Sequence, residues 1–529
     1  MKKILLSIFA IVAIVISTQA QWIEQNSNLA DSRGIDYMSA VDASVVWAAA
    51  YDGTTPANSC RDYTKTIDGG TTWVAGTVTT ATGTTGLKFA MIEAVDANKA
   101  WAPMFRASGS KPMGIYATTD GGTTWAKQET APFTNSASFP NCLHFWDANT
   151  GWCMGDPISG KFEMYTTTDG GTTWTAVPGA NSPTPLSGEW GIVGYKSVVG
   201  DIVWFGTNLG RIYKSVDKGL NWTVASCTPF EGIYIKPFFK DETTGLIMDL
   251  DATSGSPGRL AKTSDGGATF TEVIQTGNVF NNDMAFIPGS ESTWVRTGAD
   301  AASGLAGVTY SFDDGETWID MAATIGLQFL ATDFIDDSTG WAGAFANSGA
   351  GGMYKFDGNL VAPVPDFEAS DTAIVLGGQV TFTNLSSPGT TSFQWTFEGG
   401  IPATSTAENP PAITYNNSGA FNVTLKATNE WGDMTLVKTD YIYVGGTGIN
   451  DLSQASVKVY PNPVVDQLNI ESSVNIQEIR IINLVGQAVL IQNSDANIMT
   501  INTSDLKSGI YNLKLKMADG YINKKIVVN

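Results

Sequence analysis

The stretch Thr66-Ile67-Asp68-Gly69-Gly70-Thr71-Thr72-Trp73 decides the fold, because the chain repeats it. The pattern S/T-x-D-x-G-x-T-W returns at 118–125 and 167–174, and in altered form at 215–222, 263–270 and 311–318. Its aspartates are 52, 49, 48, 48 and 48 residues apart: Asp68, Asp120, Asp169, Asp217, Asp265 and Asp313. A regular spacing of this size is typical of a β-propeller with one four-stranded blade per repeat.

The motif has a structural chemistry of its own. Its carboxylate can accept backbone N–H groups across a tight turn, and the glycine two positions after the aspartate allows a positive φ. The threonine hydroxyl closes the loop, and the final aromatic residue is expected to pack between neighbouring sheets. These residues therefore predict a turn that holds a blade together, not a catalytic element.

A second repeated pattern gives the number of blades. A turn followed by an aromatic strand occurs at 41–47, 95–101 and 146–152, and its aromatic or apolar position returns at Trp204, Leu246, Trp294 and Trp341. This predicts seven blades, the last without the aspartate turn. Residues 21–25 resemble 124–128, an outer strand, so the first strand of the mature chain is expected to complete the seventh blade and close the ring.

The repeated turn resembles the Asp-box, or BNR repeat, of sialidase-like propellers and of propellers that assist photosystem assembly. The resemblance covers residues 21–360 and implies the fold. It implies little about activity, because Asp-boxes in that superfamily lie on the rim, away from the active site.

The bulk composition fits an exported all-β protein. With 56 glycines, 16 tryptophans and no long helical stretches, turns and strands dominate the 529 residues. The net charge of -21 disfavours nucleic acid and anionic lipid as partners. Lys2, Lys3, the apolar run 4–16 and Ala20 predict a signal peptide over residues 1–20. No later apolar run is long enough to span a bilayer, so no integral membrane segment is expected after cleavage.

The four cysteines leave two alternatives open. Cys142 and Cys153 flank a hairpin-like stretch and could form a disulfide across two antiparallel strands. Free thiols buried in a large stable domain are the other interpretation. The sequence contains no pattern that indicates a metal site or a cofactor.

Two smaller β-sandwich domains are expected after the propeller. Residues 361–445, with Trp395-Thr-Phe397-Glu-Gly-Gly400, resemble an immunoglobulin-type PKD (polycystic kidney disease) domain, although one aspartate of the family motif is missing. A linker is expected at 446–455. Residues 456–529, with Tyr460-Pro-Asn-Pro463 and the basic end Lys524-Lys525-Ile-Val-Val528, resemble the C-terminal sorting domain of type IX secretion in Bacteroidetes-type bacteria. This resemblance implies the type IX machinery as a partner, and a secreted or cell-surface location.

A ligand site is expected on the loop face, defined here as the side of the ring opposite the Asp-box turns. Its loops carry the candidate ligand-binding residues Arg61, Arg106, Trp190, Arg211 and Arg259, and the candidate catalytic pair Glu189 and Asp156. His144, on an inner strand, is a further candidate, with a hydrogen-bonded core histidine as the alternative. For the arginines the alternative is pairing with a nearby carboxylate, and for Trp190 it is burial between blades.

The chain lacks most elements of known catalysts on this fold. A sialidase needs three converging arginines and a Tyr/Glu/Asp set, whereas the propeller contains few arginines and no F/Y-R-I-P element. The favoured hypothesis is therefore an exported protein that binds an extracellular glycan or protein and is not an enzyme. The alternatives are a secreted glycoside hydrolase using Glu189 and Asp156, and an assembly factor, which the sorting domain disfavours.

Overall fold

The computed structural model describes residues 21–529 except 56, 136–138, 252–257, 322–323, 348–349, 446–456 and 519. The predicted signal peptide and linker lie outside the described residues. The chain divides into two compact units, one ending at Val361 and the other beginning at Ala362. Both are built from β-strands, and the first also contains short 3₁₀ turns at Gly179–Asn181, Thr228–Phe230 and Ala301–Ser303.

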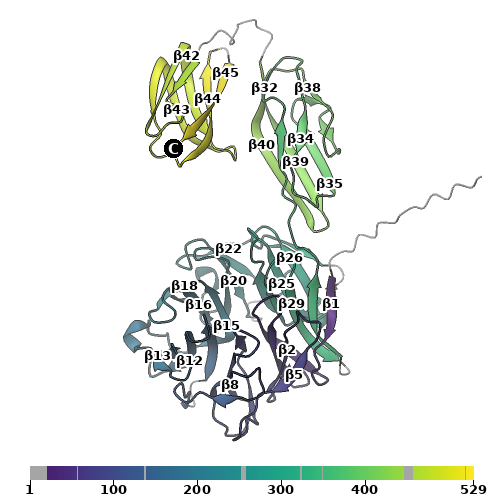
Figure 1. The fold of residues 1–529 in the computed structure, drawn as a ribbon, viewed down its shortest axis with the longest axis vertical. Coiled ribbons are helices and arrows are strands. Elements are labelled where there is room, and N and C mark those ends of the chain that lie inside the picture. The colour runs from purple at the N-terminus through teal and green to yellow at the C-terminus, as the bar shows by residue number, and fades with distance from the viewer. Residues whose placement is uncertain are drawn as a thin grey trace, which may run out of the picture. The chain divides into compact units, whose positions relative to one another are not determined.

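The first unit is a ring of seven blades, which confirms the predicted seven-bladed propeller (Figure 1); the last and first blades are joined into one sheet through the Gly34–Phe345 pair. Blade 1 comprises β2 (Arg33–Ala40), β3 (Val46–Asp52), β4 (Asp62–Thr66) and β5 (Val74–Thr77). Blade 2 comprises β6 (Leu87–Phe89), β7 (Glu93–Ala94), β8 (Ala100–Arg106), β9 (Gly114–Thr118) and β10 (Ala126–Lys127). Blade 3 comprises β11 (Pro140–Phe145), β12 (Gly151–Ile158), β13 (Lys161–Thr167) and β14 (Thr175–Ala176). Blade 4 comprises β15 (Gly191–Val199), β16 (Ile202–Thr207), β17 (Arg211–Ser215) and β18 (Thr223–Ser226). Blade 5 comprises β19 (Ile235–Phe239), β20 (Gly245–Asp249), β21 (Leu260–Thr263) and β22 (Thr271–Val273).

The last two blades complete the ring. Blade 6 comprises β24 (Asp283–Phe286), β25 (Trp294–Asp300), β26 (Leu305–Ser311) and β27 (Thr317–Asp320), with β23 (Thr276–Gly277) parallel to β27. Blade 7 comprises β28 (Ala331–Phe334), β29 (Gly340–Asn347), β30 (Ala350–Asp357) and β1 (Gln21–Asn26). The first described strand thus becomes the outer strand of the last blade.

Ring closure follows the sequence prediction. β1 runs antiparallel to β30, with Trp22 opposite Phe356. Gln25 accepts a hydrogen bond from Trp73 Nε1 of blade 1 at 2.9 Å, just as Gln128 accepts one from Trp174 Nε1 at 2.8 Å. The similarity between residues 21–25 and 124–128 therefore reflects the same contact between neighbouring blades.

The Asp-box turn forms the bonds that its residue types allow. Asp68 Oδ1 accepts the Thr72 N–H at 2.8 Å, and the Thr66 hydroxyl donates to Asp68 while accepting the Gly70 N–H at 2.8 Å. Gly70 has a φ of 89°, and a Cβ there would lie 2.5 Å from Gln25 Oε1. The backbone conformation favours glycine at this position, and a Cβ there would also displace the end of the Gln25 side chain.

The core lies between adjacent sheets. The second strands carry tryptophans that are at most 2% exposed: Trp47, Trp101, Trp152, Trp204, Trp294 and Trp341. Several reach the next blade; Trp101 Nε1, for example, donates to the Gly170 carbonyl at 3.1 Å and Trp204 Nε1 to the Gly266 carbonyl at 3.0 Å. Large aromatic side chains therefore supply both the apolar packing and the polar links between blades.

The proposed disulfide between Cys142 and Cys153 is wrong. In the β11–β12 pair, Cys142 lies opposite Met154 and Cys153 opposite Leu143. Because side chains alternate between the two faces of a sheet, the two thiols point to opposite faces. All four cysteines are free and buried, and burial raises the pKa of the Cys142 thiol to about 12.

The second unit contains the two smaller domains. The PKD-like part comprises β31 (Phe367–Ala369), β32 (Ala373–Val375), β33 (Gln379–Val380), β34 (Phe382–Asn384), β35 (Ser392–Phe397), β36 (Gly400–Ile401), β37 (Thr404–Ser405), β38 (Ile413–Tyr415), β39 (Gly419–Asn429) and β40 (Gly432–Gly445). Its core contains Trp395, which is fully buried and donates from Nε1 to the Ala407 carbonyl.

The last domain comprises β41 (Val457–Tyr460), β42 (Gln467–Ile482), β43 (Ala488–Asn502), β44 (Gly509–Met517) and β45 (Gly520–Val528). Its opening motif holds its closing strand, because Asn462 Nδ2 donates to the Lys525 carbonyl and Asn462 Oδ1 accepts the Val527 N–H. The Y-P-N-P start and the end of the chain thus form one structural element.

Candidate functional site

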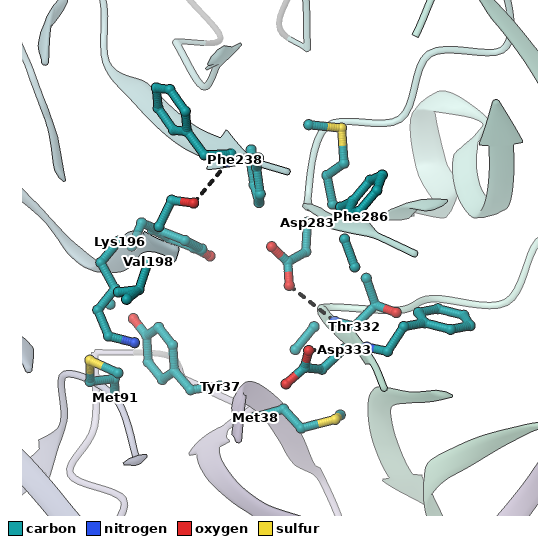
Figure 2. Close-up of a pocket in the computed structure, with 18 of the residues that line it drawn as sticks. Tyr37, Met38, Met91, Lys196, Val198, Phe238, Asp283, Phe286, Thr332 and Asp333 are labelled. Atoms are coloured by element: carbon teal, nitrogen blue, oxygen red, sulfur yellow. Dashed lines mark hydrogen bonds between the residues drawn. The ribbon is translucent and has the colours of Figure 1, made fainter. Parts of the chain in front are cut away.

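A cavity of about 580 Å³ lies in the central channel of the propeller (Figure 2). Its wall is formed by the inner parts of every blade except blade 3. Figure 2 shows Asp283 and Asp333 on one side of the cavity, with Tyr37 and Lys196 on the other. A volume of this size is typical of sites for small ligands.

Three aspartates line the cavity, and a buried lysine outside the lining, Lys236, lies close to one of them. Burial raises the pKa of Asp36 and of Asp283, and raises that of Asp333 to about 7. Lys236 is 2% exposed, and its Nζ lies 4.0 Å from Asp283 and 3.2 Å from the centre of the Tyr195 ring. Burial lowers the pKa of Lys236 to about 8. The channel therefore holds carboxylates that resist ionisation beside a largely desolvated ammonium group.

The aspartates reach the cavity in different ways. Asp36 lies at a bulge of β2, since Ile35 pairs with Ala50 and Tyr37 pairs with Ala49. A bulge re-aims a side chain out of the regular alternation. Asp283 accepts the Thr332 N–H of blade 7 at 3.0 Å, and Asp333 accepts the Ala40 N–H of blade 1 at 3.0 Å. These two carboxylates also connect neighbouring blades.

Beside the cavity, His144 belongs to a compact ionic group. Its Nδ1 lies 2.6 Å from Glu93 Oε1, and Lys196 Nζ lies 2.9 Å from Glu93 Oε2. Burial opposes ionisation of Glu93, but Lys196 and His144 outweigh it and bring its pKa to about 2. Burial also opposes ionisation of His144, and it therefore lowers the pKa of this side chain. His144 is thus held by hydrogen bonding in the interior, as the alternative interpretation expected.

On the loop face, Trp190 is 40% exposed and therefore does not lie buried between blades. Its ring meets the ring of Tyr234, also 40% exposed, edge to face with centroids 6.0 Å apart. Asn208 fixes the loop, because its Oδ1 accepts the Trp190 N–H at 2.7 Å and its own N–H donates to the Trp190 carbonyl. The two rings form what we call the aromatic platform, Trp190 and Tyr234.

The candidate catalytic carboxylates are both engaged by neighbours. Glu189 is 4% exposed; it accepts the Leu186 N–H at 2.8 Å and lies 3.4 Å from the Arg211 guanidinium. Asp156 is 9% exposed and accepts the Asn141 amide at 2.6 Å. Burial raises the pKa of Asp156 to about 6.

The arginine candidates have local partners. Arg211 donates to the Tyr213 hydroxyl in addition to its contact with Glu189. Arg259 lies 2.9 Å from Asp249 and 3.4 Å from Glu272. Arg61 donates to the Thr84 hydroxyl, and Arg106 donates to the Lys111 carbonyl. Arg211 and Arg259 thus pair with carboxylates, the alternative weighed above, whereas Arg61 and Arg106 contact a hydroxyl and a backbone carbonyl instead.

None of the predicted site residues lines the channel cavity. The lining instead reaches the Asp-box side of the ring. It includes Val199, Lys240 and Pro288, which lie at the ends of inner strands. The turns that follow these strands contact the Asp-box turns. The signal available in the sequence was the set of charged residues in the inner strands, upstream of the repeated tryptophans: Asp36, Lys196, Lys236, Asp283 and Asp333. Nothing in the linear order shows that these residues meet.

Comparisons with known proteins identify the two C-terminal domains. Residues 458–529 match the secretion system C-terminal sorting domain, and residues 366–439 match the PKD domain. Both predicted resemblances are confirmed, and the type IX sorting domain indicates that the protein is exported to the cell surface or beyond. No curated protein matches the chain in sequence.

Solved structures that resemble the chain are distant. One described as YCF48 bound to D1 peptide is 15% identical, covers 65% of this chain and 98% of its own, with a TM-score of 0.45. YCF48 from Cyanidioschyzon merolae is 16% identical, covers 64% and 99%, with a TM-score of 0.44. PorZ, a surface component of the type IX secretion system of Porphyromonas gingivalis, is 10% identical, covers 96% and 100%, with a TM-score of 0.22. The fold assignment therefore rests on the strand pairing itself.

A membrane-spanning helix and a metal-ligand cluster are both absent from the described residues. No helix among them has the length and apolar character needed to cross a membrane. No group of three or more His, Cys, Asp or Glu side chains within that part of the chain is arranged to hold a metal ion.

Proposed function

We propose that this exported protein binds an extracellular glycan through the aromatic platform on the loop face of its propeller. The observation that carries the proposal is the exposure of Trp190 and Tyr234, in a protein whose other tryptophans are mostly buried. Aromatic rings with one exposed face supply large contact area at low entropic cost, and sugar rings stack on such faces.

The surroundings of the platform support a binding role. The Asn208 clamp on the Trp190 backbone holds the loop before any ligand arrives, which reduces the ordering cost of binding. The Glu189–Arg211 pair beneath it is buried and stiffens the same loop. The PKD-like domain then acts as a spacer between the propeller and the sorting domain.

Hydrolysis is the less favoured function. Glu189 and Asp156 are both nearly buried and already hydrogen-bonded, so neither carboxylate is free to face a sugar. A glycoside hydrolase needs two carboxyl groups on opposite sides of an accessible bond. We therefore favour binding without cleavage.

The test is a glycan array probed with the mature chain and with Trp190→Ala. Loss of the platform is expected to weaken retention about tenfold or more, as truncation of an aromatic anchor does at other interfaces. Leu220→Ala is the matched control, because Leu220 is 50% exposed but lies in an Asp-box turn on the other side of the ring. Unchanged retention by Trp190→Ala would contradict the proposal, as would binding of proteins alone. Release of reducing sugar would favour the hydrolase.

A further inference from the structure

The carboxyl groups that line the channel cavity outnumber the lysines that line it. Glu93 and Lys196 neutralise each other at 2.9 Å, and Lys240 is held by Asp314 at 2.8 Å. The lining also contains three aspartates, Asp36, Asp283 and Asp333. Lys236 is not part of the lining, but its Nζ lies 4.0 Å from Asp283 and it attracts Asp36. Lys88 also attracts Asp36, but it lies over the Phe105 ring outside the lining.

Several polar groups that face the cavity lack hydrogen-bond partners in the structure. Within the described residues, no hydrogen bond is seen to the Asp36 carboxylate or to the hydroxyls of Tyr37 and Tyr195, although all three side chains line the cavity. Burial raises the pKa of both tyrosines well above its usual value, and all three side chains are partly exposed. Polar groups that face a cavity without a protein partner are available to water or to a ligand.

The remaining wall is apolar. Met38, Val198, Phe238 and Phe286 also line the cavity, and Figure 2 shows them around it, with Val198 beside Lys196 and Phe286 beside Asp283. An anion would meet the carboxylates at close range. A metal ion is disfavoured because the described residues contain no suitable ligand group. A cation with an apolar body matches both the charge and the wall.

We propose that the channel cavity is a binding site for a small organic cation, an ammonium or guanidinium group carried on a short apolar chain. Asp36 and Asp283 accept hydrogen bonds from the cationic group, and the aromatic rings of Tyr37 and Tyr195 flank it. This site is separate from the aromatic platform and does not depend on the glycan-binding proposal.

Isothermal titration of the mature chain with cadaverine tests the proposal. Cadaverine is expected to bind, and pentanediol, which has the same chain length without charge, is expected not to bind. Asp36→Asn is expected to weaken cadaverine binding about tenfold or more, because a charge-assisted hydrogen bond is lost. Asp31→Asn, at an exposed carboxylate outside the cavity lining, is the matched control and should bind as the unaltered chain does.

Asp283→Asn provides a second variant, because its amide oxygen can still accept the Thr332 N–H and preserve the contact between blades. Circular dichroism and melting temperature establish that each variant is folded. The proposal is overturned if the unaltered chain does not bind cadaverine, if pentanediol binds equally well, or if both folded variants bind as tightly as the control. Binding of calcium or of a lysine-rich peptide in place of cadaverine would also overturn it. Trp190→Ala should leave cadaverine binding unchanged, so the two proposals fail independently.

Discussion

Asp333 shows how one residue serves both the fold and the chemistry of the channel. Its carboxylate accepts the N–H groups of Ala40 and Phe334, each at 3.0 Å, so it ties blade 7 to blade 1. Burial is the main reason why its pKa rises to about 7; the nearby Asp283 adds to this rise and Lys196 opposes it. The residue that links the first and last blades therefore titrates near neutral pH.

We expect Asp333 to make the protein less stable as pH rises from about 4 to about 7. Its pKa in the fold lies above the unfolded value of about 4, so the folded state retains a proton that the unfolded state has lost. Asn cannot ionise but retains an oxygen for the Ala40 N–H. The free energy of unfolding of Asp333→Asn, minus that of the unaltered chain, should therefore be larger at pH 8 than at pH 5.

Denaturant unfolding at the two pH values measures this difference, with Asp31→Asn as the control for an exposed carboxylate. If Asp333→Asn changes the free energy of unfolding equally at pH 5 and at pH 8, the raised pKa does not belong to Asp333.

The inner strands repeat one contact from blade to blade. In blades 1, 4 and 7, the inner-strand residue that pairs with the second-strand tryptophan accepts a backbone N–H from the inner strand of the next blade. The bonds are Ala94 N–H to Ser39 Oγ, Phe239 N–H to Ser197 Oγ and Ala40 N–H to Asp333 Oδ2. Blade 2 differs, because Glu93 occupies this position and contacts the His144 ring instead. Such bonds set the spacing of inner strands around the channel.

β1 is the element on which ring closure depends. Trp22 is 7% exposed and packs against the rings of Phe329, Phe334 and Phe356. Trp22→Ala should lower the free energy of unfolding by about 3–5 kcal/mol, because a large side chain leaves a cavity in a packed core. Ile23→Ala on the same strand is the control, since Ile23 is 49% exposed. Equal costs for the two variants, measured by denaturant unfolding, would show that the closure does not depend on this packing.

At the scale of the whole molecule, the sorting domain determines the destination of the protein. Deletion of 458–529 in a host that has type IX secretion should abolish its appearance at the cell surface and in the medium. Deletion of 366–439, the PKD domain, is the control and should leave export intact. Immunoblots of surface, medium and cell fractions measure the outcome. Export of the protein without residues 458–529 would contradict a role of this domain as the export signal.

Much of the architecture was predictable because it is encoded locally. The Asp-box residues lie within eight positions of one another, so each turn forms from its own segment, and six copies establish the blade repeat. The pairing of Gln25 with Trp73 was accessible too, through the similarity of residues 21–25 to a strand after an Asp-box. The possible disulfide between Cys142 and Cys153 was wrong, because the register of the β11–β12 hairpin places Cys142 opposite Met154 and Cys153 opposite Leu143.

The sequence alone thus determined the seven-bladed ring, its closure by the first strand and the exported C-terminal domains, since each depends on short motifs or on their spacing. Only the tertiary structure decided where the charged groups gather. Asp36, Lys236 and Asp283 come from three different blades, and they meet because the ring brings the inner strands around one channel. Each motif records only its own turn, whereas a cavity on the axis depends on how several blades are arranged around it.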